Sequence, residues 1–255
     1  MYAAERQQAM TQLVRELGRM SVVELAQRYD VTTETVRRDL SILEDRHLIR
    51  RVHGGAVSAD ALTLIEAGLP DRDVARIEQK QRIGAVALDL LPHADSTVII
   101  DAGSTTIRFS RLLPPTLRIT VVTHAVPIAA QLAGQPQIEL HLLPGRVRRH
   151  THAAVGAETI EALGRVRADI AFLGANGITV GHGFSTPDRT EAAVKRAIVA
   201  QAQRVVVLAD SSKVGVERTI KFAELSDVDT LVTDREISAS ERKAFEATGL
   251  EVVTA

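Results

Sequence analysis

Residues 31–57 read VTTETVRRDLSILEDRHLIRRVHGGAV and decide the fold of the N-terminal part of the chain. The hydroxyl of Thr32 can cap the first turn of a helix, and Glu34 adds a negative charge where the helix dipole favours one. Three apolar side chains recur at helical spacing and predict one buried stripe: Val36, Leu40 and Leu43. The sequence therefore predicts an amphipathic helix that packs one face on a core.

The opposite face of this helix is polar and basic. It carries Glu34, Arg38, Ser41 and Asp45, flanked by Thr35 and Arg37. Arginine near the start of a helix suits the DNA major groove, because its planar fork matches the guanine edge and also reaches phosphates. The pattern favours a recognition helix.

The residues after this helix predict a small basic wing. Residues 48–57 fit two short strands around the turn Gly54-Gly55. Arg50, Arg51 and His53 can then lie on flanking phosphates. A plainer interpretation stays open, in which the arginines form a solvated face neutralised by nearby acids: Asp39, Glu44 and Asp45.

The residues before this stretch complete the pattern. A first helix is expected over residues 4–17, with Gly18 as its stop. Ser21 and Glu24 form a capping box that opens a second, short helix through about residue 28. Three helices followed by a hairpin predict a winged helix-turn-helix. The candidate DNA contacts are Ser21, Thr32, Thr33, Thr35, Arg37, Arg38, Ser41, Arg50, Arg51, His53 and Gly54.

Composition narrows the classes of function. The formal net charge is −1, and residues 1–57 hold nine arginines against eight acidic residues, so DNA affinity must come from local placement of charge. The chain has no cysteine, which excludes disulfides and thiolate metal sites. Neither a signal peptide nor a membrane-length apolar run is present, so a cytoplasmic protein without a membrane partner is expected.

Beyond the wing, the pattern changes to an α/β alternation. Residues 58–73 predict a linker between a DNA-binding domain at 1–57 and a second domain at 74–255. A helix is expected over residues 75–91. Strands are expected at 97–100, 119–122, 138–142, 170–173, 205–208, 230–232 and 251–253. Near-continuous apolar strands alternating with helices predict a mostly parallel sheet covered on both faces.

Ligands of such sheets bind outside the carboxyl ends of the strands. After the first strand, Asp101 and Gly103 precede three hydroxyl residues that open a helix: Ser104, Thr105 and Thr106. Glycine lets a ligand approach the backbone, and a helix N-terminus attracts an anion. This turn is therefore a candidate phosphate site.

Three later loops fall on the same edge. Asp210 can accept sugar hydroxyls and Lys213 adds a positive charge, while Gly145 and Arg146 belong to a further basic loop. Residues 174–186 are expected to form a long loop able to cover a ligand.

Plainer interpretations stay open for these loops too. Gly-Ser-Thr-Thr after a strand is often only a turn and a helix cap. Asp210 and Lys213 fit a surface ion pair, and Arg148 and Arg149 fit solvent-facing side chains. His150 and His152 fit loop residues better than metal ligands, so no metal and no cofactor are expected.

Residues 5–57 closely resemble the N-terminal domain of DeoR-type bacterial transcription regulators. The TVRRDL segment and the RVHGGA wing are the specific parts. The resemblance implies that Thr35, Arg37 and Arg38 contact DNA. His47 departs from the family, which usually has glycine after the helix as a left-handed cap.

The remainder resembles the C-terminal sensor domain of the same family through five segments: DAGSTT, VVTHAVPIA, LLPGR, AFLGANGI and LADSSK. That domain is similar in fold to ribose-5-phosphate isomerase and binds phosphorylated sugars without turning them over. His124 stands where the family usually has asparagine, which puts one polar contact in question. The expected ligand positions are Asp101, Gly103, Ser104, Thr105, Thr106, His124, Gly145, Arg146, Asp210 and Lys213.

The leading hypothesis is a repressor of sugar catabolism genes that binds double-stranded operator DNA and is released by a phosphorylated sugar. The segments ALTLIEAGLP and GFSTPDRTEAAVKRA look most like regulators of fructose utilisation, so fructose 1-phosphate is the expected effector. A homodimer or homotetramer is expected, because helix-turn-helix proteins read paired half-sites.

Two other classes stay open. A sugar-phosphate isomerase with an N-terminal appendage would use Asp101 as its base, although no second acid or base stands at a recognisable spacing. A nicotinamide-binding sensor is disfavoured, because no Gly-x-Gly-x-x-Gly follows the first strand.

Overall fold

The structure, a computed structural model, divides into two compact units, Met1–Leu64 and Ile65–Ala255. The residues that it describes are 3–17, 19–46, 48–52, 54–58 and 68–255. Gly18, His47 and His53 lie outside the described residues, so the predictions that concern them stay untested. Among the described residues, no helix is long and apolar enough to cross a membrane.

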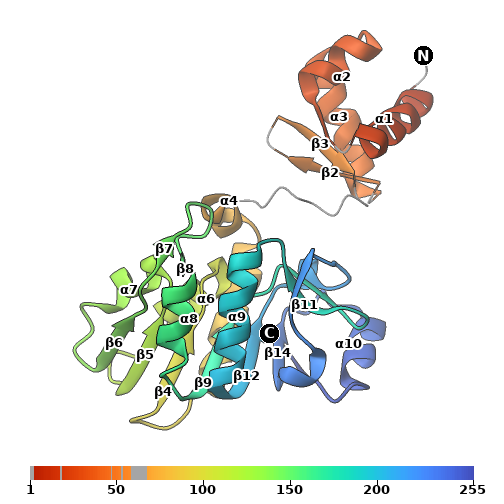
Figure 1. Ribbon diagram of the computed structural model, residues 1–255. Helices are drawn as coiled ribbons and strands as arrows, with labels where there is room; N and C mark the ends of the chain where they lie inside the picture. Colours follow the sequence, from red (N-terminus) through yellow and green to blue (C-terminus); the bar gives the residue numbers. More distant parts are fainter. Residues whose placement is uncertain (1–2, 18, 47, 53, 59–67) are drawn as a thin grey trace. The chain divides into compact units, whose positions relative to one another are not determined.

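Three helices and a three-stranded sheet make up the described part of the first unit (Figure 1). The elements are α1 (Ala3–Leu17), β1 (Arg19–Ser21), α2 (Val22–Tyr29), α3 (Thr33–Asp45), β2 (Ile49–Val52) and β3 (Gly55–Ser58). The strand order is β1-β3-β2, and both pairs are antiparallel. The predicted winged helix-turn-helix is confirmed. Strand β1 was not predicted, because three residues are too few to show an alternating pattern.

The helix ends follow the predicted capping residues. The Ser21 hydroxyl accepts a hydrogen bond from the Glu24 amide at 3.1 Å, and the Glu24 carboxylate accepts one from the Ser21 amide at 2.8 Å. The Thr32 hydroxyl likewise accepts a hydrogen bond from the Thr35 amide at 3.2 Å. These bonds satisfy amides that the helices themselves leave unpaired.

The predicted stripe of α3 lies in the core of the first unit. Val36, Leu40 and Leu43 are buried and pack with three residues from α1 and α2: Met10, Val14 and Leu25. Gly55 closes the sheet over this core, because a Cβ atom there would lie 2.2 Å from the carbonyl oxygen of Met20 in β1.

Seven parallel strands form the central sheet of the second unit, in the order β15-β14-β12-β9-β4-β5-β6. They are β4 (Thr97–Ile100), β5 (Ile119–Thr123), β6 (Ile138–Leu142), β9 (Ala168–Leu173), β12 (Ala202–Leu208), β14 (Thr230–Thr233) and β15 (Glu251–Thr254). All seven predicted strands and their parallel pairing are confirmed. The winding reverses between β4 and β9, which is where such sheets form a crevice at their carboxyl ends.

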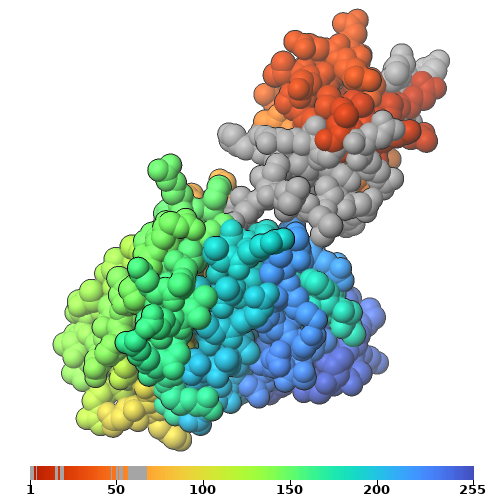
Figure 2. All heavy atoms as spheres, in the orientation of Figure 1, coloured from red at the N-terminus to blue at the C-terminus, as the bar shows by residue number. Residues whose placement is uncertain are grey.

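Helices cover both faces of this sheet. One face carries α5 (Ile77–Ala87), α6 (Ser104–Arg111) and α7 (Val126–Leu132), and the other carries α8 (Ala157–Leu163), α9 (Arg189–Gln201) and α10 (Ala239–Glu246). The alternation within β4 divides the core, since Val98 and Ile100 pack with Phe109 of α6 while Ile99 packs with Ile198 of α9. Helices α8 and α9 stand in front of the sheet in Figure 1, and their side chains form much of the surface in Figure 2.

The helix expected over residues 75–91 is present but shorter, as α5. A separate helix, α4 (Leu69–Val74), precedes α5, and a 3₁₀ turn, η1 (Leu88–Leu90), follows it. Arg76 breaks the helix between α4 and α5 with a left-handed φ of 52°. Helix α4 falls within residues 58–73, so this part of the expected linker belongs to the second unit.

The prediction of a long loop over residues 174–186 is wrong. This stretch forms a hairpin of β10 (Gly177–Thr179) and β11 (Gly183–Thr186), which pairs with β13 (Ile220–Ala223). A second hairpin joins β7 (Arg146–Val147) to β8 (Ala154–Val155). The glycines of residues 177–186 were taken as a sign of irregular structure. They belong instead to a hairpin of short strands, in which Gly183 adopts a left-handed φ of 73°.

Replacing Leu40 with alanine should lower the free energy of unfolding of the first unit by about 2–5 kcal/mol, because it leaves a cavity in a small core. Calorimetry of the full chain should show the transition of this unit moving to lower temperature. Val23→Ala is the matched control, since Val23 is 57% exposed. Equal effects of the two changes would contradict the assigned core.

Candidate functional site

The exposed face of α3 carries the arginines that the sequence singled out. Arg37 and Arg38 are exposed, and Arg37 lies 3.3 Å from Glu34 in an ion pair that is open to solvent. Thr33, Thr35 and Ser41 are partly exposed beside them. Exposed ion pairs contribute little, so both guanidinium groups can reach a partner in solution.

Two of the three acids that were expected to neutralise this face are engaged elsewhere, while the third, Asp45, is exposed. Asp39 is 4% exposed and binds Arg6 at 2.7 Å and Gln7 at 2.8 Å, both from α1. Glu44 accepts a hydrogen bond from the backbone amide of Arg51 at 2.8 Å, which ties α3 to the wing. The arrangement therefore disfavours a face whose charges cancel.

The wing presents the remaining candidates. Arg51 is exposed, and Gly54 is exposed at the turn with a left-handed φ of 79°. The side chain of Arg50 lies outside what the structure describes, as does all of His53. Ser21 and Thr32 serve as helix caps, and their hydroxyls are engaged there.

A pocket of about 90 Å³ opens at the carboxyl edge of the central sheet, beside the reversal between β4 and β9. Five predicted positions line it: Gly103, Ser104, Thr105, Asp210 and Lys213. The N-terminus of α6 contributes the hydroxyls, and Lys213 comes from the turn η2 (Ser211–Lys213). Hydroxyls, a helix N-terminus and a cation are the groups that hold a phosphate.

Five other predicted positions do not line this pocket. Thr106 is buried, and its hydroxyl donates to the carbonyl of Gly103 at 2.9 Å. Gly145 packs on α8, where a Cβ atom would lie 2.2 Å from the Thr159 hydroxyl. Arg146 is exposed on β7. Asp101 and His124 lie beneath the pocket floor.

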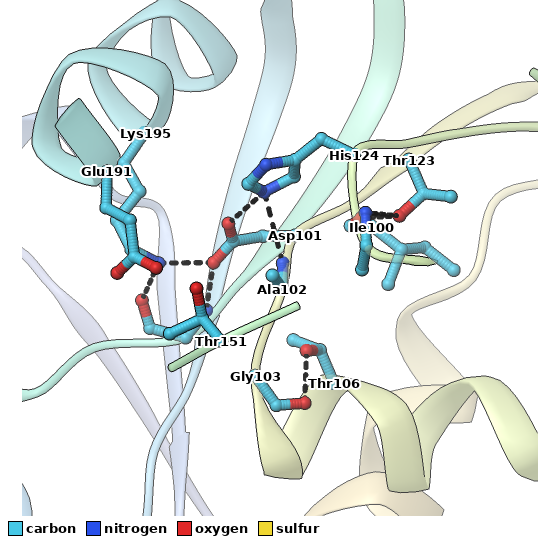
Figure 3. A network of polar contacts seen from close by, with 12 residues as sticks. Ile100, Asp101, Ala102, Gly103, Thr106, Thr123, His124, Thr151, Glu191 and Lys195 are labelled. Atoms are coloured by element: carbon cyan, nitrogen blue, oxygen red, sulfur yellow. Dashed lines mark hydrogen bonds and ion pairs between the residues drawn. The ribbon is translucent and has the colours of Figure 1, made fainter. Parts of the chain in front are cut away.

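Asp101 is fully buried in a charged network (Figure 3). Its carboxylate accepts hydrogen bonds from the Lys195 ammonium, from His124 Nε2 at 2.9 Å and from the Gly174 amide at 2.9 Å. Burial alone would raise the pKa of Asp101, but the charge of Lys195 and the bond to His124 outweigh it and hold the pKa at about 2. Asp101 is therefore an ionised structural anchor.

His124 and Lys195 extend this network. The Nδ1 atom of His124 lies 2.8 Å from the carbonyl oxygen of Ala154, so the ring ties the end of β5 to β8. Lys195 also donates to the carbonyl of Gly174 at 2.8 Å and stands 5.2 Å from the centre of the Phe222 ring. Sequence reasoning missed Lys195, because nothing around it within α9 distinguishes it from a solvent-facing lysine.

The wall opposite α6 is basic and was also missed. Arg72, Arg76 and Lys80 line the pocket from the α4–α5 segment. The guanidinium of Arg76 binds Asp210 at 3.1 Å and Glu236 at 2.6 Å. Asp210 is 1% exposed and paired with Arg76, and its expected role toward sugar hydroxyls stays a prediction.

Lys80 is the most buried cation of this wall, with 4% of its surface exposed. Its ammonium donates to the carbonyl oxygens of Arg72 and of Ala75, the latter at 2.7 Å. Burial lowers the pKa of Lys80 to about 8, opposed by the charge of Asp210 and aided by Lys213, Arg108 and Arg72. The sequence did not show that these charged side chains meet around Lys80, because they come from four separate elements: α4, α5, α6 and η2.

The expectation that Arg148 faces solvent is wrong. Its side chain is 11% exposed and binds Glu191 at 2.5 Å and Asp188 at 3.2 Å. Both acids lie at the start of α9, so Arg148 fixes the β7–β8 hairpin to the helix that carries Lys195. Among the described residues, no group of three or more metal-ligating side chains lies together.

A winged helix-turn-helix joined to a sensor-type α/β unit defines the class of two-domain transcription regulators. The DeoR-like helix-turn-helix domain matches residues 6–61, and the DeoR C terminal sensor domain matches residues 75–235. The chain belongs to the DeoR family of transcriptional regulators.

Relatives span the whole chain. The HTH-type transcriptional regulator FruR of Bacillus subtilis (strain 168) is 34% identical over 92% of this chain and 93% of its own length. The glycerol-3-phosphate regulon repressor of Escherichia coli (strain K12) is 30% identical over 92% of each chain. Ribose 5-phosphate isomerase A of Methanocaldococcus jannaschii is 20% identical over 55% of each chain with a TM-score of 0.40, a likeness from which no activity follows.

The affinity of the pocket for a phosphomonoester should fall as the pH rises through about 8. Lys80 is charged below its pKa of about 8 and neutral above it, so its attraction for an anion is present at neutral pH and lost in mild alkali. The phosphate is a dianion throughout, because its second pKa is about 6. Isothermal titration of the full chain with fructose 1-phosphate measures this. Lys80→Arg should flatten the profile, and a flat wild-type profile would remove Lys80 from the site.

Proposed function

We propose that this regulator represses genes of sugar catabolism and that a phosphorylated sugar releases it from its operator. The observation that carries the proposal is the pocket at the carboxyl edge of the sheet, where Ser104 and Thr105 face a wall that includes Lys80 and Lys213. In a chain whose net charge is −1, such a concentration of positive groups favours an anionic ligand.

Fructose 1-phosphate is the effector that we propose. The segment GFSTPDRTEAAVKRA, which supports this choice by its likeness to regulators of fructose utilisation, builds β11 and the first half of α9. It supplies Glu191 to the pocket wall and Lys195 to the network below. The name of the Escherichia coli relative, a glycerol-3-phosphate regulon repressor, supports a phosphorylated metabolite in general terms.

The exposed arginines of α3 and the wing support operator DNA as the partner of the first unit. Arg37, Arg38 and Arg51 are exposed on these elements, and double-stranded DNA is the partner that such a surface fits. We propose a homodimer or homotetramer, because paired recognition helices read paired half-sites.

Binding without turnover is the interpretation that we favour for the sensor unit. An isomerase base must reach the carbon acid of its substrate, yet Asp101 is fully buried and held between Lys195 and His124. A carboxylate whose pKa is about 2 is also a weak base at neutral pH. Incubation with aldose and ketose phosphates tests this alternative, and interconversion of the two would establish an enzyme.

Fructose 1-phosphate should release the full chain from a promoter fragment of its own operon, as measured by fluorescence anisotropy. Fructose and inorganic phosphate should act only at much higher concentration, because each supplies only part of the ligand. Lys213→Ala should keep operator affinity and lose the response. If an unrelated sugar phosphate releases the operator instead, that compound and not fructose 1-phosphate is the effector. If Lys213→Ala still responds, the effector does not bind in the proposed pocket.

Arg38→Ala should weaken operator binding by about 1–3 kcal/mol if the guanidinium reads a base. If it contacts a phosphate, the loss should be similar for all sequences, and the dependence of affinity on salt should become shallower by about one ion. Titrations at several salt concentrations distinguish the two. Arg242→Ala, an equal loss of charge from the exposed face of α10, is the control. Identical titrations for the two variants would exclude Arg38 from the DNA interface.

A further inference from the structure

Helix α4 is the first described element of the sensor unit after residues 59–67, which connect it to the wing. Leu69 packs in the core of the unit, and polar contacts at three places also hold α4 to the rest of the unit. The Leu69 amide donates to the carbonyl of His150 at 2.7 Å. Arg108 of α6 donates to the Asp73 carbonyl at 2.6 Å and to its carboxylate at 3.0 Å. Lys80 of α5 forms the third contact.

Lys80 differs from the other two contacts because it also lines the pocket. Its ammonium donates to the carbonyl oxygens of Arg72 and Ala75, at the C-terminal end of α4. Neither Arg108 nor His150 belongs to the described lining of the pocket. An ammonium has three N–H groups, so two hold α4 and one remains for an anion.

The surroundings of Lys80 make its charge sensitive to the pocket. Arg72, Arg108 and Lys213 oppose a positive charge at this buried position, and Asp210 favours one. Asp210 is already shared with Arg76. A phosphate in the pocket would supply the missing negative charge, and a hydrogen bond from a charged donor is about twice as strong as one from a neutral donor.

We infer that Lys80 couples the pocket to α4: an anion that binds the third N–H group of Lys80 holds the ammonium in place and thereby tightens the attachment of α4. The inference rests on the proposed function, since it explains how an occupied sensor would alter the segment that leads to the DNA-binding unit. A ligand must favour one state of such a segment to act on a distant site.

Arg76 separates α4 from α5. It adopts the left-handed conformation between α4 and α5, and its side chain is fixed to Asp210 and Glu236. The start of α5 is thus held to the ends of β12 and β14 by Arg76 itself. Lys80 and Arg108 both donate to carbonyl oxygens at the end of α4. Of these two residues, Lys80 belongs to the lining of the pocket and Arg108 does not.

Hydrogen exchange of the full chain tests the coupling. In the wild type, saturating fructose 1-phosphate should slow amide exchange over residues 69–76 by about tenfold, the change that charge-assisted bonds to this segment would produce. Inorganic phosphate serves as a second probe and should slow exchange at the same amides. Unchanged exchange over residues 69–76 in the wild type, with either anion bound, overturns the inference without any variant.

Lys80→Met keeps the length of the side chain and removes the ammonium. Residues 69–76 should exchange faster in the free variant, and a bound anion should no longer slow them. The operator affinity of this variant should not respond to fructose 1-phosphate even at saturation. Ser104→Ala is the matched control, because it removes a polar group from the pocket wall on α6: it should bind the effector more weakly yet respond fully at saturation.

The outcomes separate this coupling from the proposed function. If fructose 1-phosphate releases operator DNA while residues 69–76 exchange at an unchanged rate, the coupling is wrong and the proposed function stands. If the anions slow exchange over these residues but no sugar phosphate alters operator binding, the coupling stands and the proposed effector response is wrong. A full response at saturation in Lys80→Met contradicts the coupling directly.

Discussion

The buried ion pair between Lys195 and Asp101 organises the sensor unit. It joins the middle of α9 to the end of β4, and through His124 and Gly174 it reaches the ends of β5 and β9. Removing one member of such a pair leaves an uncompensated charge in the interior, which costs several kcal/mol. The four segments that surround the reversal of the sheet are therefore held in one arrangement, and the pocket above them has a fixed floor.

The charged groups below this floor are paired with one another, whereas the cations above it line the pocket. Below it, the carboxylate of Asp101 is paired with the ammonium of Lys195 and is closed to solvent. Above it, Lys80, Lys213 and the hydroxyls of Ser104 and Thr105 line the pocket. The positive charges around Lys80 exceed the negative charge of Asp210, and a bound anion would offset the difference. A similar division occurs in the first unit, where α3 turns one of its four acids, Asp39, toward the core and leaves Arg38 exposed. A chain of net charge −1 can in this way offer two separate surfaces to anions.

Local patterns predicted most of the fold, because caps and strands depend on neighbours in the sequence. Ser21 and Thr32 cap their helices as expected, and all seven strands of the parallel sheet stand where β-branched runs predict them. The candidate site was predicted only in part. Asp101 was singled out, but its contact with Lys195, which lies 94 residues away, was not foreseen. Lys80 and Arg148 escaped for the same reason: whether a basic side chain faces solvent or a buried acid depends on tertiary contacts that no local pattern carries.

A crystal structure of the full chain with fructose 1-phosphate bound would test the central claim most directly. The account predicts a phosphate between the hydroxyls of Ser104 and Thr105 and the ammonium groups of Lys80 and Lys213, with the carboxylate of Asp101 still bound to Lys195. A carboxylate of Asp101 turned away from Lys195 and in contact with the sugar would contradict it, since the residue would then be part of the ligand chemistry and not of the frame that holds it.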